Sequence, residues 1–291
     1  MSVKHRSKCK ILGGLRLGLI QLSVGANKAN NVQNALKFVR KAKEGGSNII
    51  VLPECFNAPY GTKYFPEYAE SIPDGETSRA LSAAAKEVKA YIVGGSIPEK
   101  DGSKLYNTST VWSPDGQLVA KHRKMHLFDI DIPGGITFKE SEVLSPGNTS
   151  CIFDTEYCKI GIGICYDIRF LNYKIQYHFL LPGCDILIYP GAFNMTTGPL
   201  HWDLLARARA VDNQVFVAAV SPARDEKADY IAYGHTCAVD PWGKTLAQAG
   251  AEEELLFADI DFETMKNIRQ QIPVSHQKRN DVYDLVVKSN L

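Results

Sequence analysis

The sequence predicts an α/β protein, built as a four-layer α-β-β-α sandwich of two similar halves. Three observations lead to this prediction. Short apolar runs alternate with amphipathic stretches of helical period, a Pro/Gly turn then joins two strand-like segments, and this order of elements occurs twice. Two sheets that each carry helices on one face can bury their bare faces against each other. The alternative is a single open, doubly wound sheet with a ligand at its switch point.

The first half is expected to form three strands with two intervening helices, and then a hairpin. The expected strands are 15–21, 48–54 and 90–97, and the expected helices are 27–44 and 77–89. The hairpin joins 105–112 to 117–124 through Ser113-Pro114-Asp115-Gly116. Pro and Gly at these positions favour a turn between paired strands.

The second half repeats this order of elements. Strands are expected at 159–165, 185–191 and 214–221, helices at 170–181 and 200–213, and a hairpin turn at Asp240-Pro241-Trp242-Gly243. Four landmarks align in the same order: 16–18 with 159–161, 51–53 with 188–190, Ser96 with Ser221, and 114–116 with 241–243. We therefore expect one domain over 1–291, with a basic tail at 1–14 and an arm at about 271–291 that packs on the body or a partner subunit.

Composition excludes several classes of protein. The chain has 33 Lys+Arg against 32 Asp+Glu, and no basic stripe interleaved with aromatic residues, so we expect no nucleic-acid partner. No apolar run approaches the ~18 residues that span a bilayer, so no membrane span is expected. The basic N-terminus lacks the apolar core and cleavage site of a secretory signal. The expected location is the cytoplasm, and a short mitochondrial address is the alternative.

The seven cysteines are an odd number without a Cys-x-x-Cys pair, which indicates a reducing compartment and no zinc site. The segment Gly161-Ile162-Gly163 continues to Tyr166, where a dinucleotide-binding loop would have its third glycine. No cofactor and no metal are therefore expected. His122 and His126 have the spacing of a metal pair on a helix, but they lie in a strand-to-loop segment and fit a satisfied polar loop better.

Three polar side chains follow predicted strands, where α/β proteins collect functional groups. They are Glu54, Lys124 and Cys165, and Cys165 stands just before a predicted helix. A thiolate is the nucleophile, so Cys165 needs a base or a positive field to lower the pKa of its thiol. Glu54 can be that base, and Lys124 with the backbone N–H of Tyr166 can stabilise an oxyanion. The set predicts acyl transfer from an amide to the thiol and then to water.

Each of these side chains also has a purely structural explanation. Cys165 has apolar neighbours in the sequence and fits a buried core cysteine. Glu54 fits a helix cap or the partner of an arginine, and Lys124 fits a solvated strand end. The chemical prediction depends on the three side chains taken together.

These residues carry a resemblance to a known family. Leu52-Pro53-Glu54, 122–128 and 161–170 resemble the three motifs of the nitrilase superfamily of carbon–nitrogen hydrolases, and the similarity continues through 189–193 and 206–213. The resemblance implies the α-β-β-α sandwich, a small-molecule amide substrate and a homodimer. Carried over by position, it implies Glu54 as general base, Lys124 as stabiliser of the oxyanion and Cys165 as nucleophile.

Within the superfamily, 126–133 together with 138–141 is most similar to the omega-amidase, or Nit-protein, branch. That branch implies hydrolysis of the terminal amide of 2-oxoglutaramate or 2-oxosuccinamate, through a cysteine thioester, to ammonia and the 2-oxo diacid. It also implies a second glutamate, and Glu140 is the candidate to orient Lys124 or the substrate amide, with a surface carboxylate as the alternative. Arg169 is a candidate for binding a substrate carboxylate or for pairing with Asp167.

The sequence differs from the family motif at one point, and other classes of protein are alternatives to this interpretation. Many relatives continue the cysteine motif with Phe-Pro-Glu, whereas Phe170 is followed by Leu171 and Asn172 here. A papain-like Cys-His enzyme also uses a thiolate, but no cysteine has that family's local surroundings. A deaminated-glutathione amidase or another hydrolase of the superfamily would share the same triad. A binding protein that kept the fold is the non-enzymatic alternative.

Overall fold

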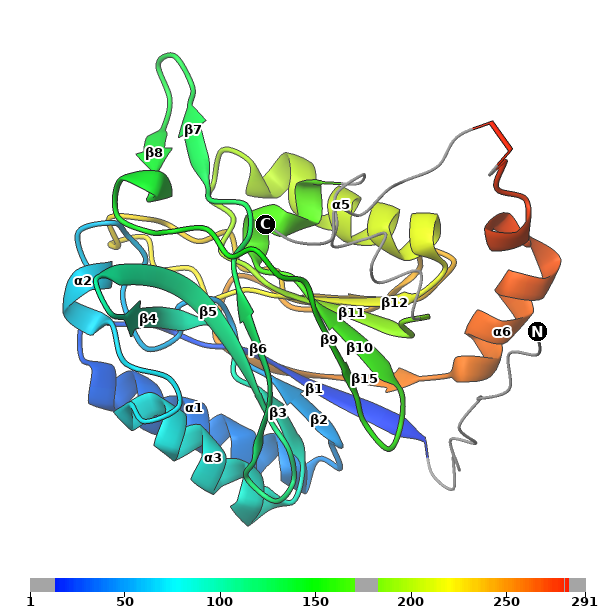
Figure 1. Cartoon of the computed structure of the whole chain (residues 1–291), viewed down its shortest axis with the longest axis horizontal. Helices are drawn as coiled ribbons and strands as arrows, with labels where there is room; N and C mark the ends of the chain where they lie inside the picture. The colour runs from blue at the N-terminus through cyan, green and yellow to red at the C-terminus, as the bar shows by residue number, and fades with distance from the viewer. Residues whose placement is uncertain (1–13, 171–182, 280, 283–291) are drawn as a thin grey trace.

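The computed structural model describes residues 14–170, 183–279 and 281–282. In this part of the chain two β-sheets pack face to face, and helices cover their outer faces (Figure 1). One cluster of buried apolar side chains lies between the sheets, a second lies between the first sheet and its helices, and a third lies between the second sheet and its helix. The predicted four-layer α-β-β-α sandwich is confirmed.

The first sheet has seven strands in the order β15-β1-β2-β3-β5-β4, with β6 paired to β5. Its strands are β1 (Leu15–Gln21), β2 (Ile49–Val51), β3 (Tyr91–Val93), β4 (Ile97–Asp101), β5 (Lys104–Trp112), β6 (Leu118–Arg123) and β15 (Glu254–Ile260). The strands β1, β2 and β3 are parallel, and β5 and β6 form the predicted hairpin. Helices α1 (Lys28–Glu44) and α3 (Glu76–Val88) cover this sheet.

The second sheet has six strands in the order β14-β13-β12-β11-β10-β9. They are β9 (Cys151–Asp154), β10 (Lys159–Ile162), β11 (Ile186–Pro190), β12 (Phe216–Val220), β13 (Cys237–Val239) and β14 (Thr245–Gln248). Helix α5 (Gly198–Asn213) covers its outer face. The expected helix at 170–181 lies almost wholly outside the described residues.

The two sheets have equivalent topologies, as the internal repeat predicts. A parallel trio, β1-β2-β3 or β10-β11-β12, is followed in each sheet by an antiparallel pair, and an antiparallel strand flanks its first member. In the second sheet this flanking strand is β9, which directly precedes β10. In the first sheet it is β15, which comes from the far end of the chain, so the halves are joined by a strand that the sequence analysis did not predict.

Several smaller elements also lie outside the predicted set. They are α2 (Phe65–Tyr68), the hairpin of β7 (Asp129–Asp131) and β8 (Thr137–Lys139), α6 (Phe262–Gln271), and 3-10 turns at Glu140–Glu142, Cys165–Arg169 and Val274–His276. The expected loop around Glu140 is therefore a short hairpin followed by a 3-10 turn. The helix expected directly after the nucleophile is, over the described residues, the 3-10 turn Cys165–Arg169.

The expected strand at 90–97 is interrupted, and a glycine explains the break. Strand β3 ends at Val93 and β4 starts at Ile97. Between them Gly95 has a positive φ of 50°, and a Cβ atom there would lie 2.0 Å from the carbonyl oxygen of Pro53. Only glycine allows this backbone and this close approach. The chain turns here against the segment that leads to Glu54.

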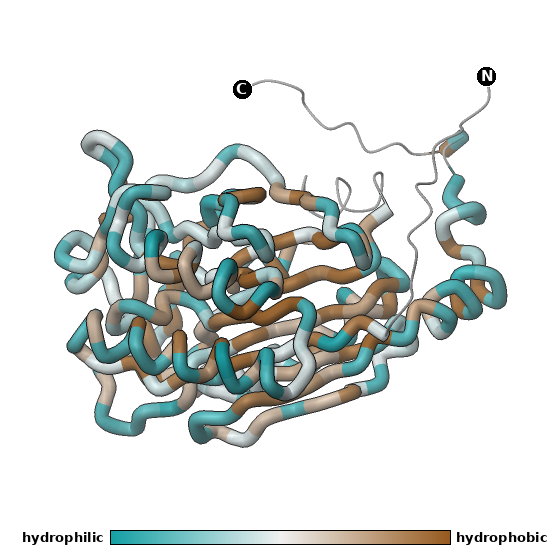
Figure 2. The backbone as a smooth tube through the Cα atoms, turned by 90° about the horizontal axis from the view of Figure 1, so that it is seen from below, coloured by the Kyte–Doolittle hydropathy of each residue, from teal (hydrophilic) through white to brown (hydrophobic). Residues whose placement is uncertain are grey.

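The distribution of hydropathy follows the layers. Figure 2 shows hydrophobic segments concentrated in the strands and hydrophilic segments around the periphery. Strands β2, β3, β11 and β12 are buried at every residue, as expected for strands covered on both faces. Burial of this apolar surface stabilises the sandwich and leaves the strand ends and their loops to carry polar groups.

Candidate active site

Glu54 lies just past the carboxyl end of β2, fully buried between the two sheets. Three groups from both halves hold its carboxylate. Oε1 accepts hydrogen bonds from Asn107 Nδ2 at 2.8 Å and Lys124 Nζ at 3.1 Å, and Oε2 accepts one from the backbone N–H of Ala192 at 2.6 Å. The nearby Cys165 thiol acts to lower the pKa of this carboxylate. Glu54 is therefore the group through which the two halves meet.

Lys124 directly follows β6 and its side chain is also fully buried. Its ammonium lies 3.1 Å from Glu54 Oε1, and 3.0 and 2.9 Å from the two oxygens of Glu140. Glu140 in turn accepts hydrogen bonds from the Tyr60 hydroxyl and from the backbone N–H of Phe128, both at 2.7 Å. Every charge in this buried set has a partner of opposite sign, which offsets the cost of its desolvation.

Cys165 follows β10 after two residues and starts the 3-10 turn. Its φ of 47° is in the left-handed region, where a residue with a side chain is strained. Gly191 packs directly against it, since a Cβ atom at 191 would lie 3.2 Å from the Cα of Cys165. The backbone N–H of Ala192, the next residue, donates to Glu54 and acts to lower the pKa of the thiol. The turn thus places Cys165 beside the segment that holds the carboxylate.

Burial dominates the electrostatics of the carboxylate and the ammonium. It raises the pKa of Glu54, with the charge of Glu140 in the same direction, although Lys124 and the Cys165 thiol oppose the rise. Burial acts to lower the pKa of Lys124, but the carboxylates of Glu140 and Glu54 outweigh it and the pKa lies well above its ordinary value. Lys124 therefore remains charged, and Glu54 has the raised basicity that suits proton transfer near neutral pH.

The thiol differs from the expectation of a lowered pKa. Burial, followed by the charge of Glu54, raises the pKa of Cys165 well above its ordinary value, and Lys124 only partly opposes this. Over the described residues, a 3-10 turn of five residues stands where the sequence analysis invoked the positive end of a helix. The resting thiol is thus neutral, and a nucleophilic role for it would need a base close by to take its proton.

A narrow recess leads to Cys165 and is lined mainly by aromatic rings. Its walls are Phe128, Tyr166, Arg169, Ala192, Phe193, Thr197 and Tyr230. The ring of Tyr166 packs edge-on against that of Phe128, with 5.2 Å between centroids. In this conformation the recess is too narrow for a water molecule, so a substrate must displace part of this wall.

Arg169 lies in this recess, and its predicted pairing with Asp167 is wrong. Its guanidinium lies over the rings of Phe193 and Tyr166, at 4.7 and 5.6 Å from their centroids, and Nη1 is 3.1 Å from His201 Nδ1. Its Nε is buried and has no hydrogen-bond partner within the described ranges. Asp167 instead binds His122 and His126, because it points back toward the Lys124 segment.

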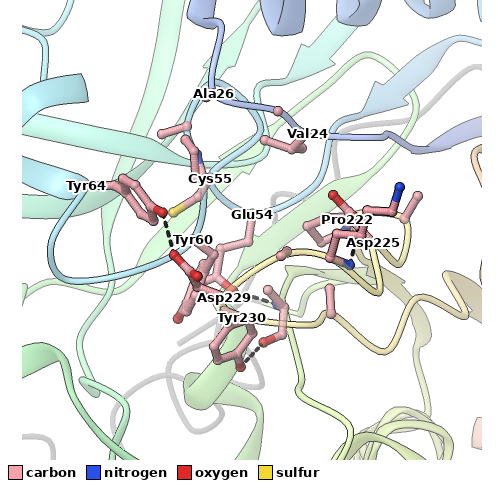
Figure 3. A pocket seen from close by; sticks show the side chains of 18 residues that line it. Val24, Ala26, Glu54, Cys55, Tyr60, Tyr64, Pro222, Asp225, Asp229 and Tyr230 are labelled. Atoms are coloured by element: carbon pink, nitrogen blue, oxygen red, sulfur yellow. Dashed lines mark hydrogen bonds between the residues drawn. The ribbon is translucent and has the colours of Figure 1, made fainter.

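A larger cavity of about 250 Å³ borders the other side of the site (Figure 3). Glu54, Cys55, Tyr60 and Tyr230 line it, together with loop residues after β1 and β12. The Tyr230 hydroxyl donates a hydrogen bond to the carbonyl oxygen of Ala192 at 2.6 Å. Because Tyr230 lines both this cavity and the Cys165 recess, its ring forms part of the wall between them.

The sequence analysis missed several residues that hold the site. Tyr60 hydrogen-bonds Glu140, and Asn107 and Ala192 hydrogen-bond Glu54. Tyr230 hydrogen-bonds Ala192, and Asp167 lies between two histidines. Tyr60 follows Glu54 in a loop at the carboxyl edge, and Ala192 lies within the motif 189–193, so both carried a signal. Asn107 sits inside a strand and could not be recognised without the sheet register.

His122 and His126 both bind the Asp167 carboxylate, which is the polar arrangement that the sequence favoured over a metal pair, although His122 Nδ1 is buried without a hydrogen-bond partner among the described residues. Within residues 14–170, 183–279 and 281–282, no three metal-ligating side chains are grouped so that they could hold an ion. In the same ranges, no helix is both long and apolar enough to cross a bilayer.

Comparison with known proteins identifies the class to which this site belongs. A sequence profile of carbon–nitrogen hydrolases matches residues 16–270, and the chain therefore belongs to the carbon–nitrogen hydrolase family. The family prediction from the three motifs is confirmed, and with it the prediction of an amidase.

Particular relatives narrow the comparison. Omega-amidase NIT2 of Bos taurus is 58% identical over 275 residues, which are 94% of this chain and 99% of the relative. The Homo sapiens protein of the same name is 58% identical over 273 residues, covering 94% and 98%. Among solved structures, Nit3 of Saccharomyces cerevisiae, from branch 10 of the nitrilase superfamily, has a TM-score of 0.84 at 44% identity, covering 93% and 98%. The C. elegans NitFhit protein has a TM-score of 0.83 at 30% identity, covering 94% and 67%.

Proposed function

We propose that the protein is an omega-amidase, which hydrolyses the terminal amide of 2-oxoglutaramate or 2-oxosuccinamate to ammonia and the 2-oxo diacid. The observation that carries the proposal is the 58% identity to omega-amidase NIT2 over 94% of the chain. The buried set of Glu54, Lys124 and Cys165 supports it, because this set supplies a base, a cation and a nucleophile within one site.

Acylation starts from the neutral thiol. Glu54 takes the proton of Cys165 as the sulfur attacks the amide carbonyl carbon, so no free thiolate accumulates. The ammonium of Lys124 and the backbone N–H of Tyr166 stabilise the tetrahedral oxyanion. Glu54 then donates its proton to the leaving nitrogen, the C–N bond breaks, ammonia departs, and a thioester on Cys165 remains.

Deacylation uses the same base in the same protonation state as at the start. The departure of ammonia leaves Glu54 ionised, so it can take a proton from water as the water oxygen attacks the thioester. When the tetrahedral intermediate collapses, the C–S bond breaks and Glu54 returns its proton to the Cys165 sulfur. The carboxylic acid leaves, and the site is back in its resting state.

Arg169 is the group we propose for the substrate's remote carboxylate. It lines the recess beside Cys165, and its Nε is buried without a partner in the described part of the chain. A buried cation without a carboxylate is costly, and a bound carboxylate would offset that cost. Arginine also binds carboxylates through two parallel hydrogen bonds. This arrangement favours an anionic amide over a neutral one of the same length.

The test is ammonia release from a panel of 2-oxoglutaramate, 2-oxosuccinamate, glutamine, deaminated glutathione, a carbamoyl amide and a simple nitrile. The expected result is turnover of the two 2-oxo amides, and its loss in Cys165→Ala with little change in melting temperature. Cys184→Ala is the matched control, because it removes another buried thiol whose charged neighbours are Asp185 and Lys159 and not Glu54. Faster turnover of deaminated glutathione would make that amide the substrate in place of the two 2-oxo amides. An active Cys165→Ala protein would exclude the mechanism.

We also propose a homodimer. Helix α5 presents Leu200, Leu204 and Val211 along one side, and Leu200 is 69% exposed. An exposed apolar stripe on a helix is typical of an interface. Light scattering should give twice the chain mass of 32.2 kDa for the wild type, and the single mass for Leu204→Glu. A monomeric wild type would contradict the proposal.

For the whole chain we propose one cooperative domain, because β15 completes the first sheet and the two sheets share a core. A single unfolding transition seen by both tryptophan fluorescence and circular dichroism would support it, and two separate transitions would refute it. The proposed location is the cytoplasm, with a mitochondrial fraction as the alternative that cell fractionation would detect.

A further inference from the structure

A buried group outside the proposed catalytic set joins the two segments that carry it. Asp167 lies two residues after Cys165, while His122 and His126 lie two residues before and after Lys124. The Asp167 side chain is fully buried, and so is that of His122. These three side chains, which we name the His-Asp-His brace, take no part in the chemistry described above.

The Asp167 carboxylate accepts four hydrogen bonds, two on each oxygen. Oδ2 accepts from His122 Nε2 at 3.1 Å and from the backbone N–H of Ile164 at 2.9 Å. Oδ1 accepts from the backbone N–H of His126 at 3.0 Å and from its Nδ1 at 2.7 Å. One carboxylate therefore holds the backbone next to Cys165 at Ile164, and it holds the His122 ring and the His126 backbone on the two sides of Lys124.

The charge on this carboxylate makes the connection strong. Burial acts to raise the pKa of Asp167, but the hydrogen bonds from His122 and His126 outweigh burial and hold the pKa well below its ordinary value. Hydrogen bonds to an ionised acceptor are roughly twice as strong as neutral ones. The His126 ring is further held by stacking on Phe170, with 3.9 Å between centroids.

We propose that the His-Asp-His brace sets the position of the Lys124 ammonium relative to the Cys165 sulfur, and so acts on the rate of the chemical step. The inference rests on the proposed roles of Cys165 and Lys124. These two residues come from different sheets, and the brace is a direct polar link between the segments that carry them. Asp167, His122 and His126 are positioning residues, because they touch neither the reacting sulfur nor Lys124 Nζ in the contacts described.

The physical expectation concerns kcat rather than KM. Lys124 and Cys165 act on the carbonyl as it becomes tetrahedral, so a small displacement of either weakens the transition state more than substrate binding. A misplacement of about 1 Å can cost roughly 100-fold in rate. Arg169 ends the same 3-10 turn, but its guanidinium is held by Phe193 and His201 and not by the brace, so KM should change little.

The experiment compares Asp167→Asn, His122→Leu and His122→Gln in the full-length enzyme, with ammonia release from 2-oxoglutaramate as the assay. Asparagine keeps the shape of Asp167 but places an N–H₂ group against the histidine donors. We expect Asp167→Asn and His122→Leu to lower kcat by about 10- to 100-fold with KM within about threefold. Glutamine can still donate from Nε2, so His122→Gln should recover most of the kcat lost in His122→Leu.

Glu99→Gln is the matched control. Glu99 is another buried carboxylate, and it holds β6, the strand that leads to Lys124, through Lys121 and Arg123. These contacts stay within the first sheet and do not reach the Cys165 turn. Its loss should lower the melting temperature and leave kcat within about threefold. A fall in kcat equal to that of Asp167→Asn would show that kcat follows strand stability, and would overturn the inference.

Two further outcomes would count against the positioning role of the brace. A folded Asp167→Asn enzyme with wild-type kcat would refute the brace, and so would equal kcat values for His122→Leu and His122→Gln. If Asp167→Asn fails to fold, the pair at His122 gives the answer. Cys165→Ala is assayed alongside: full activity there would refute the proposed function itself, whereas loss of activity in Cys165→Ala with unaffected brace variants refutes the positioning role alone.

Discussion

The two halves of the sandwich contribute to the site in different ways. The first half supplies charge: Glu54, Lys124 and Glu140 are fully buried and hold each other through contacts of 2.9 to 3.1 Å. The second half supplies a buried neutral thiol, Cys165, presented by backbone with a positive φ. In the mechanism that we propose, the repeated fold divides the reaction: the first half provides the charged groups, and the second half positions the thiol and lines the recess beside it.

The largest expected effect comes from neutralising the base in the first half. Glu54→Gln keeps the shape of the side chain but cannot accept the Cys165 proton. We expect kcat to fall by about 10²- to 10⁴-fold. Single-turnover assays should show that thioester formation and its hydrolysis are both slowed, since Glu54 serves both steps.

Glu70→Gln is the control for this change, because Glu70 is also a buried carboxylate of the first half, bound to Thr77 and the backbone. It should lose stability and keep its turnover rate. A normal burst of ammonia from Glu54→Gln would mean that another group takes the thiol proton.

The next largest effect tests whether the second half binds the substrate carboxylate. Arg169→Gln removes the cation from the recess, and we expect kcat/KM for 2-oxoglutaramate to fall by about 100-fold, since a hydrogen bond between charged groups is lost. A neutral amide of similar length should react at the wild-type rate. Arg40→Gln on the exposed side of α1 is the control. Equal losses for charged and neutral amides would argue against a carboxylate contact.

Glu140→Gln separates orientation from proton transfer within the first half. The Lys124 ammonium keeps its partner Glu54 in this variant but loses one of its two carboxylates. We expect kcat to fall by about tenfold, well short of the loss in Glu54→Gln, because only the placement of the ammonium is relaxed. The measurement is steady-state turnover of the two variants side by side. A loss as large as that of Glu54→Gln would place Glu140 in the proton transfer itself.

The smallest effect concerns the alkaline stability of the buried thiols. Burial raises the pKa of Cys151, Cys184 and Cys237 to about 12 each. The unfolded chain therefore loses these protons first, near pH 8.5, and the free energy of unfolding should fall as pH rises from there. Each thiol contributes a slope of about 1.4 kcal/mol per pH unit until its folded-state pKa is reached.

Urea titrations between pH 8 and 11 test this. Cys237→Ala should give a shallower decline than the wild type because one thiol is missing. Val239→Ala, in the same strand, is the control: it should be less stable at every pH with an unchanged slope. Parallel curves for Cys237→Ala and the wild type would contradict the linkage.

Local patterns in the sequence were enough for most of the strands and helices. The run 15–21 became β1 with its predicted bounds, and 105–112 and 117–124 became β5 and β6, because apolar content and turn residues act over short distances. Strands β7 and β8 have three residues each, too few for a period to show. Strand β15 alternates exposed and buried residues, yet its partner β1 could not be found without the register.

Only those site residues that lie in recognisable sequence motifs could be predicted. Glu54, Lys124 and Cys165 follow predicted strands and lie in recognisable motifs, and Glu140 came from the resemblance. The pKa of Cys165 was predicted in the wrong direction, because its φ of 47° starts a short 3-10 turn and its burial is a property of both sheets. The partners of Asp167 belong to a distant segment, and no local signal could identify them.

The pairing of β15 with β1 has a consequence for synthesis on the ribosome. The register joins Leu15 to Ile260, so the first sheet lacks this flanking strand until nearly all of the described chain has emerged. Until then the edge of β1 is open to other strands, including those of neighbouring nascent chains. Such a distant closure is also slow to find. The β1 edge is therefore paired only after β15 has emerged from the ribosome.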